Sequence, residues 1–225
     1  MMLCVLLGVL IAGWLGWREL SSRTQSKETP AVTIDKQPAV FANRTFDPAN
    51  PPGDMPPLTA AEEAECDSNF LSNASVGGRT RQTDATHGVV TITQIKVTLQ
   101  LNVTIWAPAN ESQQVLEHEE GHRQISEYYY QTADKVAGEI ATTYMDKQIE
   151  ISGTDLNAES SQALQQAAKE ITDEYDKELN PGPTQLYYDA VTDHGRNQVV
   201  VKDAVAAAIK NLPTAATQLA TNPGN

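Results

Sequence analysis

The chain has 225 residues, of which 40% are hydrophobic and 6% aromatic, an ordinary globular mix that supports one sizeable core beside its appendages. Its formal net charge of -13 and its sequence pI of about 4.6 argue against binding to nucleic acid or to anionic membrane surfaces. Only two cysteines occur, Cys4 and Cys66, so no internal disulfide framework is expected and Cys66 is predicted to be buried and inert.

The chain begins with an apolar segment. Residues 1–17 carry no charge, and Arg18 and Glu19 end the run. This length is the short limit for crossing a bilayer and long for the core of a signal peptide, so we expect a membrane anchor or, alternatively, a signal segment. Arg18, Arg23 and Lys27 follow the segment, which by the positive-inside rule would favour a cytoplasmic domain.

Proline dominates the next stretch. Seven of the 12 prolines lie in residues 18–57, mixed with polar and charged residues, so we expect an extended and largely unpacked linker. The folded domain is then predicted to span residues 58–212. Residues 213–225, which are low in charge and rich in Ala and Thr, are predicted to form a flexible tail.

Residues 87–106 alternate β-branched and polar side chains, a pattern typical of two or more half-buried strands. Helical periodicity follows, beginning at an N-cap at Asn110 and continuing to about Ile140. Further helices are predicted from a cap at Asp155 to Leu179, from Leu186 to a glycine at residue 195, and over about residues 199–212. The fold class is therefore predicted to be α+β, with a small antiparallel sheet followed by a helical region.

The most informative motif is H-E-x-x-H at residues 118–122. On a helix His118 and His122 lie about 40° apart on one face, so both imidazoles can reach one metal ion. Glu119 stands beside that ion, where its carboxylate can polarise a bound water instead of ligating. Glu120 points away from the ion, and Gly121 leaves room for another backbone to approach the helix closely.

A catalytic zinc ion usually has three protein ligands, so one more is required. His194 is the best candidate, with Asp189 and Asp193 close enough in sequence to orient its ring. Alternatives stay open. A histidine at a helix end is more commonly a simple C-cap, Glu139 fits only if the helix breaks near Gly138, and carboxylates on the following helix are also possible at Glu159, Glu170 and Glu174.

Two segments together, H-E-E-G-H-R-Q-I-S-E at residues 118–127 and Y-D-A-V-T-D-H-G-R-N-Q at residues 188–198, resemble a bacterial family of uncharacterised domains described as predicted secreted or periplasmic zinc-dependent proteases. The similarity covers roughly residues 60–200. It implies a zincin-like domain in which His118 and His122 bind zinc, Glu119 is the general base, and the second segment completes the site. The family's tryptophan soon after Gln198 is replaced here by Val199–Val201.

The sequence thus predicts a zinc metallopeptidase of peptide or protein substrates, with Zn²⁺ held by His118, His122 and His194 and with Glu119 as base. Tyr188 could donate to a developing oxyanion, although packing is the commoner role of a buried tyrosine. By the resemblance we expect the domain in the cell envelope, anchored in the inner membrane facing the periplasm, or secreted. Two alternatives are a zinc amidase acting on cell-wall peptide and a non-catalytic, membrane-tethered binding module.

Overall fold

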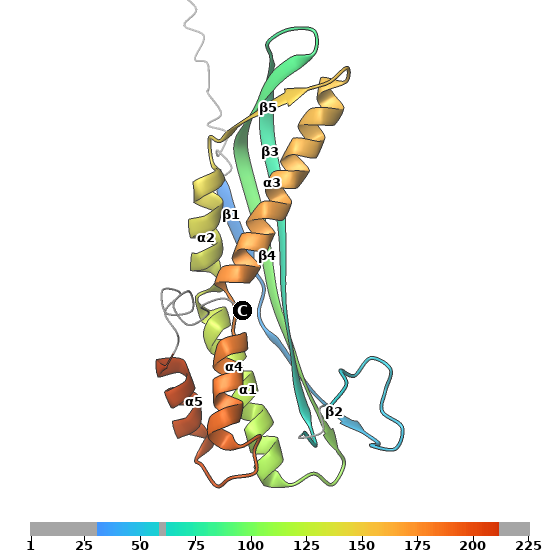
Figure 1. The fold of residues 1–225 in the computed structure, drawn as a ribbon, viewed down its shortest axis with the longest axis vertical. Helices are drawn as coiled ribbons and strands as arrows, with labels where there is room; N and C mark the ends of the chain where they lie inside the picture. The colour runs from blue at the N-terminus through green and yellow to red at the C-terminus, as the bar shows by residue number, and fades with distance from the viewer. Residues whose placement is uncertain (1–30, 59–61, 212–225) are drawn as a thin grey trace, which may run out of the picture.

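The computed structural model of the protein describes residues 31–58 and 62–211. Strands β3 (Glu65–Gln82) and β4 (His87–Pro108) form a long hairpin that runs along an elongated molecule, with the helices packed beside it (Figure 1). The expected anchor at residues 1–17 and the tail at residues 213–225 lie outside the described residues. Within the described ranges no helix is long and apolar enough to span a bilayer.

Strand β4 is the centre of an open, mixed sheet. Strand β3 pairs with it antiparallel along one edge, and the other edge takes β1 (Val32–Lys36) and β2 (Val40–Phe46) in parallel and β5 (Gln148–Ser152) antiparallel. The predicted antiparallel sheet is therefore wrong, because two N-terminal strands join it in parallel. The predicted two or more strands within residues 87–106 are one continuous strand of 22 residues.

Those two parallel strands come from the segment predicted to be an unpacked linker. Val32 and Ile34 pack against the main core, and Phe46 is only 7% exposed, so residues 32–46 belong to the folded domain. The proline content suggested a linker, but the described prolines of this segment lie outside β1 and β2: Pro38 is between the two strands and the others follow β2. At these positions a missing backbone N–H removes no hydrogen bond from the sheet.

The helices follow the predicted order with shifted ends. Ser112, and not Asn110, caps the first helix by accepting a hydrogen bond from the Val115 amide, and the chain breaks that helix at Thr132. Asp155 caps α3 as predicted, accepting from two backbone amides. The helices are α1 (Gln113–Gln131), α2 (Ala133–Tyr144), α3 (Leu156–Glu178), α4 (Gly182–Thr192) and α5 (Val201–Lys210).

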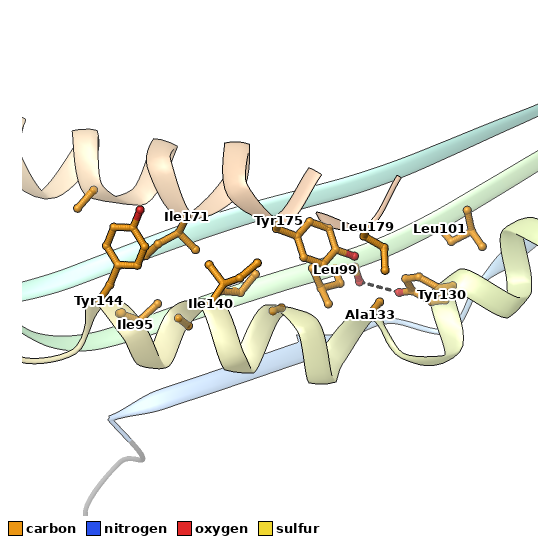
Figure 2. Packing of buried hydrophobic residues seen from close by; sticks show 14 of the residues in the cluster. Ile95, Leu99, Leu101, Tyr130, Ala133, Ile140, Tyr144, Ile171, Tyr175 and Leu179 are labelled. Atoms are coloured by element: carbon orange, nitrogen blue, oxygen red, sulfur yellow. Dashed lines mark hydrogen bonds between the residues drawn. The ribbon is translucent and has the colours of Figure 1, made fainter. Parts of the chain in front are cut away.

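The main core lies between one face of β4 and helices α1, α2 and α3. Alternate residues of β4, including Leu99 and Leu101, are buried, while polar residues between them such as Thr98 are only half-buried. Ile171 and Tyr175 of α3 belong to the same cluster, and Figure 2 shows Tyr175 beside Leu99. A second cluster joins α1, α4 and α5 through Ile125, Tyr188, Ala204, Val205 and Ala208. This smaller cluster holds α4 against the helix that carries the H-E-x-x-H motif.

Candidate metal centre

The H-E-x-x-H motif lies on α1 with the predicted face turned inward. His118 and Glu119 are each 4% exposed, and Gly121 is buried. Glu120 lies on the outer face, where its carboxylate pairs with Arg123 at 2.6 Å. The helical register inferred from the sequence is confirmed, and it leaves Glu119 as the acidic residue of the motif that faces the protein interior.

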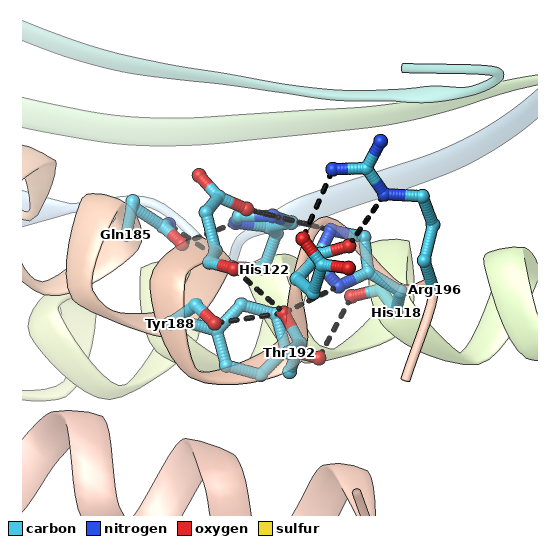
Figure 3. Close-up of polar contacts among 8 residues, drawn as sticks. His118, His122, Gln185, Tyr188, Thr192 and Arg196 are labelled. Carbon is cyan, nitrogen blue, oxygen red and sulfur yellow. Dashed lines mark hydrogen bonds and ion pairs between the residues drawn. The ribbon is translucent and has the colours of Figure 1, made fainter. Parts of the chain in front are cut away.

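Three side chains from two helices meet at one point, and Figure 3 shows the two histidines among them. The Nε2 atoms of His118 and His122 are 3.1 Å apart. The Oδ1 atom of Asp189, on α4, lies 2.8 Å from Nε2 of His122 and 3.4 Å from Nε2 of His118. These three side chains are the only group of metal-ligand type found within the described residues.

Gln185 fixes the ring of His122. The side-chain nitrogen of Gln185 donates to the His122 carbonyl at 3.1 Å and to Ser126 Oγ at 3.0 Å, so its oxygen is the atom that faces the imidazole. Nδ1 of His122 therefore donates to Gln185 Oε1, at 2.7 Å. The proton of a neutral ring is thus held at Nδ1, and Nε2 presents its lone pair to the other two side chains.

Thr192 does the same for His118. Its hydroxyl donates to the Tyr188 carbonyl at 2.7 Å, so its oxygen can accept from Nδ1 of His118, which lies 3.2 Å away. Nε2 of His118 is then also left with a lone pair. Two unprotonated ring nitrogens and a carboxylate oxygen facing one another repel, and a cation between them removes that repulsion.

The donor set fits zinc. Ligands at 2.0–2.1 Å from a tetrahedral zinc ion lie about 3.3 Å apart, close to the separations among these three atoms. Although burial opposes ionisation of Asp189, its contacts with His118 and His122 hold the pKa of its carboxyl well below the usual range. Burial lowers the pKa of His118. The low pKa of Asp189 and the lowered pKa of His118 favour the unprotonated forms that a metal ligand needs. Although burial opposes a charged ring at His122, the Asp189 carboxylate raises the pKa of His122, so a metal ion has to displace a proton from that ring.

His194, the third ligand predicted from the sequence, is outside this group. It follows α4 in a turn where Asp193, His194 and Gly195 all have positive φ angles. A side chain at Gly195 would lie 2.9 Å from Cβ and Cγ of His118, so the turn packs against that histidine. Asp189 was expected to orient His194, and the structure instead places Asp189 in the candidate group with His118 and His122. The available signal was helical spacing, because Gln185, Asp189 and Thr192 share one face of α4.

The ring of Tyr188 packs against both histidine rings. Its ring is fully buried, stacks on His118 with centroids 5.1 Å apart and meets His122 edge-on at 4.9 Å. Its hydroxyl donates to the His118 carbonyl at 3.1 Å, so its one proton is not directed at a substrate, contrary to the predicted oxyanion role. A Cβ atom at Gly121 would lie 2.0 Å from this hydroxyl oxygen. The glycine therefore makes room for the Tyr188 side chain, and not for another backbone segment as the sequence predicted.

The three side chains of the candidate metal group line a cleft of about 360 Å³ between the start of β3 and helices α1 and α4. Glu119 lines the cleft, burial raises its pKa to about 7, and within the described residues no group donates a hydrogen bond to it. Cys66 also lines the cleft, and burial raises the pKa of its thiol, in keeping with an unreactive cysteine. The carboxylate suited to proton transfer is therefore beside the metal ligands.

Comparisons of the chain with protein-family models, with curated proteins and with solved structures each found no match. The fold and the site define a mixed α and β protein that carries a candidate His-His-Asp metal centre at the junction of α1 and α4. A function for this protein has to be inferred from that centre and its cleft.

Proposed function

We propose that the protein is a zinc-dependent peptidase whose metal is held by His118, His122 and Asp189. The observation that carries this proposal is the pair of facing Nε2 atoms, 3.1 Å apart, on two rings whose Nδ1 atoms have separate hydrogen-bond partners. A pair of histidines arranged only for packing has no need of two fixed Nδ1 donors and a shared carboxylate.

A zinc ion bound here would act as a Lewis acid that lowers the pKa of a coordinated water and polarises a carbonyl group. The proton transfers fall to the protein. Glu119 accepts a proton from the attacking water while the oxygen of that water adds to the carbonyl carbon of the peptide. Glu119 then returns that proton to the amide nitrogen as the C–N bond breaks, which leaves a carboxylic acid and an amine.

The open edge of β3 supports a peptide as substrate. Within the described residues β3 pairs only with β4, so its second edge is unpaired beside the cleft that Glu65, Asp67 and Ser68 help to line. An extended peptide can pair with such an edge through main-chain hydrogen bonds. A metal-bearing helix beside a sheet edge is the arrangement expected of a zincin-like domain. The resemblance carried by the paired motifs and the apolar segment at residues 1–17 support the further proposal that the domain acts in the cell envelope, tethered by that segment.

The proposal is tested by metal content and hydrolysis measured on the same preparations. We expect one zinc per wild-type chain, and we expect Glu119→Gln to keep that zinc while losing roughly 10²- to 10⁴-fold in rate. Glu120→Gln is the matched control, since this neighbouring carboxylate faces outward and pairs with Arg123. A Glu119→Gln protein that holds zinc and cleaves at the wild-type rate contradicts the assignment of the base.

The same chemistry serves amide bonds in cell-wall peptides, so the substrate panel should hold both a peptide library and purified cell-wall fragments. We expect cleavage of library peptides. Cleavage confined to the cell-wall fragments would reassign the protein as a zinc amidase. Stoichiometric zinc without hydrolysis of either substrate would favour a binding module.

A further inference from the structure

A small chamber of about 160 Å³ adjoins the metal cleft. His118 and Glu119 line both spaces, so the chamber continues the cleft past the proposed base. Its other walls are Val115, His194, Arg196 and the two glutamates Glu62 and Glu63. A carbonyl group attacked beside Glu119 can therefore place its oxygen toward the chamber.

An unusual turn holds His194 in that chamber. Asp193, His194 and Gly195 have φ angles of 50°, 52° and 75°, and two successive non-glycine residues in this left-handed region are costly. Hydrogen bonds maintain the turn: the His194 amide donates to the Asp189 carbonyl at 3.0 Å, and Gln114 donates to the Gly195 carbonyl at 2.6 Å. The backbone therefore fixes His194 relative to both the ligand-bearing α4 and the motif-bearing α1.

The two ring nitrogens of His194 differ. Nδ1 is buried and has no hydrogen-bond partner among the described residues. A buried N–H without an acceptor is unfavourable, so the neutral ring should carry its proton on Nε2. Nε2 is not among the buried unpartnered atoms, and no described residue accepts a hydrogen bond from it. Among the residues that the structure describes, the ring thus presents one N–H donor without an acceptor.

We propose that His194 is a further catalytic residue that donates a hydrogen bond from Nε2–H to the oxygen of the scissile carbonyl. This inference rests on the proposed peptidase function. As the water oxygen adds to the carbonyl carbon, the π electrons move to the carbonyl oxygen, and the His194 donor stabilises that negative charge without transferring its proton. The electrons return to re-form the C=O bond when the C–N bond breaks and Glu119 delivers a proton to nitrogen. Tyr188 does not perform this role, because its hydroxyl donates to the His118 carbonyl.

Three substitutions of His194 distinguish the effect of losing its N–H donor from the effect of disturbing the backbone turn. His194→Gln places an amide nitrogen near the position of Nε2, His194→Asn places one near Nδ1 and tolerates the left-handed backbone, and His194→Ala offers no donor. His87→Ala is the matched control, because His87 is exposed at the opposite end of β4 and hydrogen-bonds to Asp84. Each full-length protein is assayed for zinc content, for kcat/KM, and for the affinity of a phosphinic peptide, a tetrahedral mimic of the attacked carbonyl.

We expect all three variants to keep one zinc. His194→Ala and His194→Asn should lose about 10- to 1000-fold in kcat/KM and at least about 10-fold in phosphinic-peptide affinity, with His194→Gln close to wild type. Loss of zinc from every His194 variant would make His194 a ligand and overturn the inference. Equal phosphinic-peptide affinity in wild type and His194→Ala would also overturn the inference about His194. A wild-type protein that binds zinc but cleaves no peptide would instead refute the peptidase function, and the affinity comparison can still be made with such a protein.

Discussion

The Nε2 atoms of His118 and His122 face each other at 3.1 Å while the Nδ1 atom of each ring meets its own hydrogen-bond partner. This relationship determines what the site can bind. Both Nε2 atoms and the Asp189 carboxylate are directed at one point, so we expect a cation bound there to stabilise the folded protein.

Zinc should therefore stabilise the fold. At a free zinc concentration about 100 times Kd, binding to the native state adds about 2.7 kcal/mol to the free energy of unfolding, which thermal denaturation with zinc and with a chelator measures as a higher Tm. Asp189→Ala should abolish the shift. Asp193→Asn is the control, since this exposed carboxylate pairs with Arg196. An equal zinc-dependent Tm shift in Asp189→Ala and wild type would contradict the ligand assignment.

Thr192→Val should weaken zinc binding without removing a ligand. The substitution keeps the shape of the side chain but deletes the oxygen that faces Nδ1 of His118. Loss of such a supporting partner typically reduces metal affinity about 10- to 100-fold. Competition with a chromogenic chelator measures the affinity, and Thr192→Ser, which keeps the hydroxyl, should stay close to wild type. The prediction fails if the Val and Ser variants bind zinc equally.

Gly121 of α1 and Gly138 of α2 should respond oppositely to alanine. A Cβ at Gly121 would lie 2.0 Å from the Tyr188 hydroxyl oxygen, so Gly121→Ala forces the phenol to move and should cost about 1–3 kcal/mol. At Gly138 the nearest neighbouring atom, from Ile34, is 3.8 Å away, so alanine should instead stabilise α2 by up to about 1 kcal/mol. Urea denaturation compares them, and a stabilised Gly121→Ala would show that Tyr188 does not pack there.

Two phenylalanines test the revised domain boundary. Phe46 is 7% exposed and Phe41 is 43% exposed, although both lie on β2. Phe46→Ala should lower the free energy of unfolding by about 3–5 kcal/mol, whereas Phe41→Ala should cost clearly less. If residues 32–46 were an unpacked linker, neither substitution would change the denaturant midpoint.

Local patterns in the sequence predicted what depends on local geometry. The three- and four-residue spacing around His118 and His122 predicted the buried face of α1, and Asp155 predicted the start of α3. Pairing between distant segments was not predictable in this way. Val32 pairs with Ile95 across 63 residues, and no periodicity within either short strand shows whether that partner runs parallel.

The sequence favoured His194 as the third member of the candidate metal group, where the structure has Asp189, for a similar reason. Histidine was preferred as a ligand by residue type, and the left-handed turn that carries His194 away from the ligand group has no marker in the sequence before Gly195. The spacing of Gln185, Asp189 and Thr192 in the sequence already places them on one face of a helix. Its meaning depended on knowing that α4 packs on α1, which is a long-range contact.

X-ray absorption at the zinc K-edge of the zinc-loaded wild-type protein identifies the atoms that bind the metal. We expect outer scattering from two imidazole rings, with oxygen as the remaining nearest atoms, because His118, His122 and Asp189 are the proposed ligands. Scattering from three imidazole rings would return His194 to the coordination sphere, and a sulfur atom at bonding distance would place Cys66 there; either result would contradict the His-His-Asp centre.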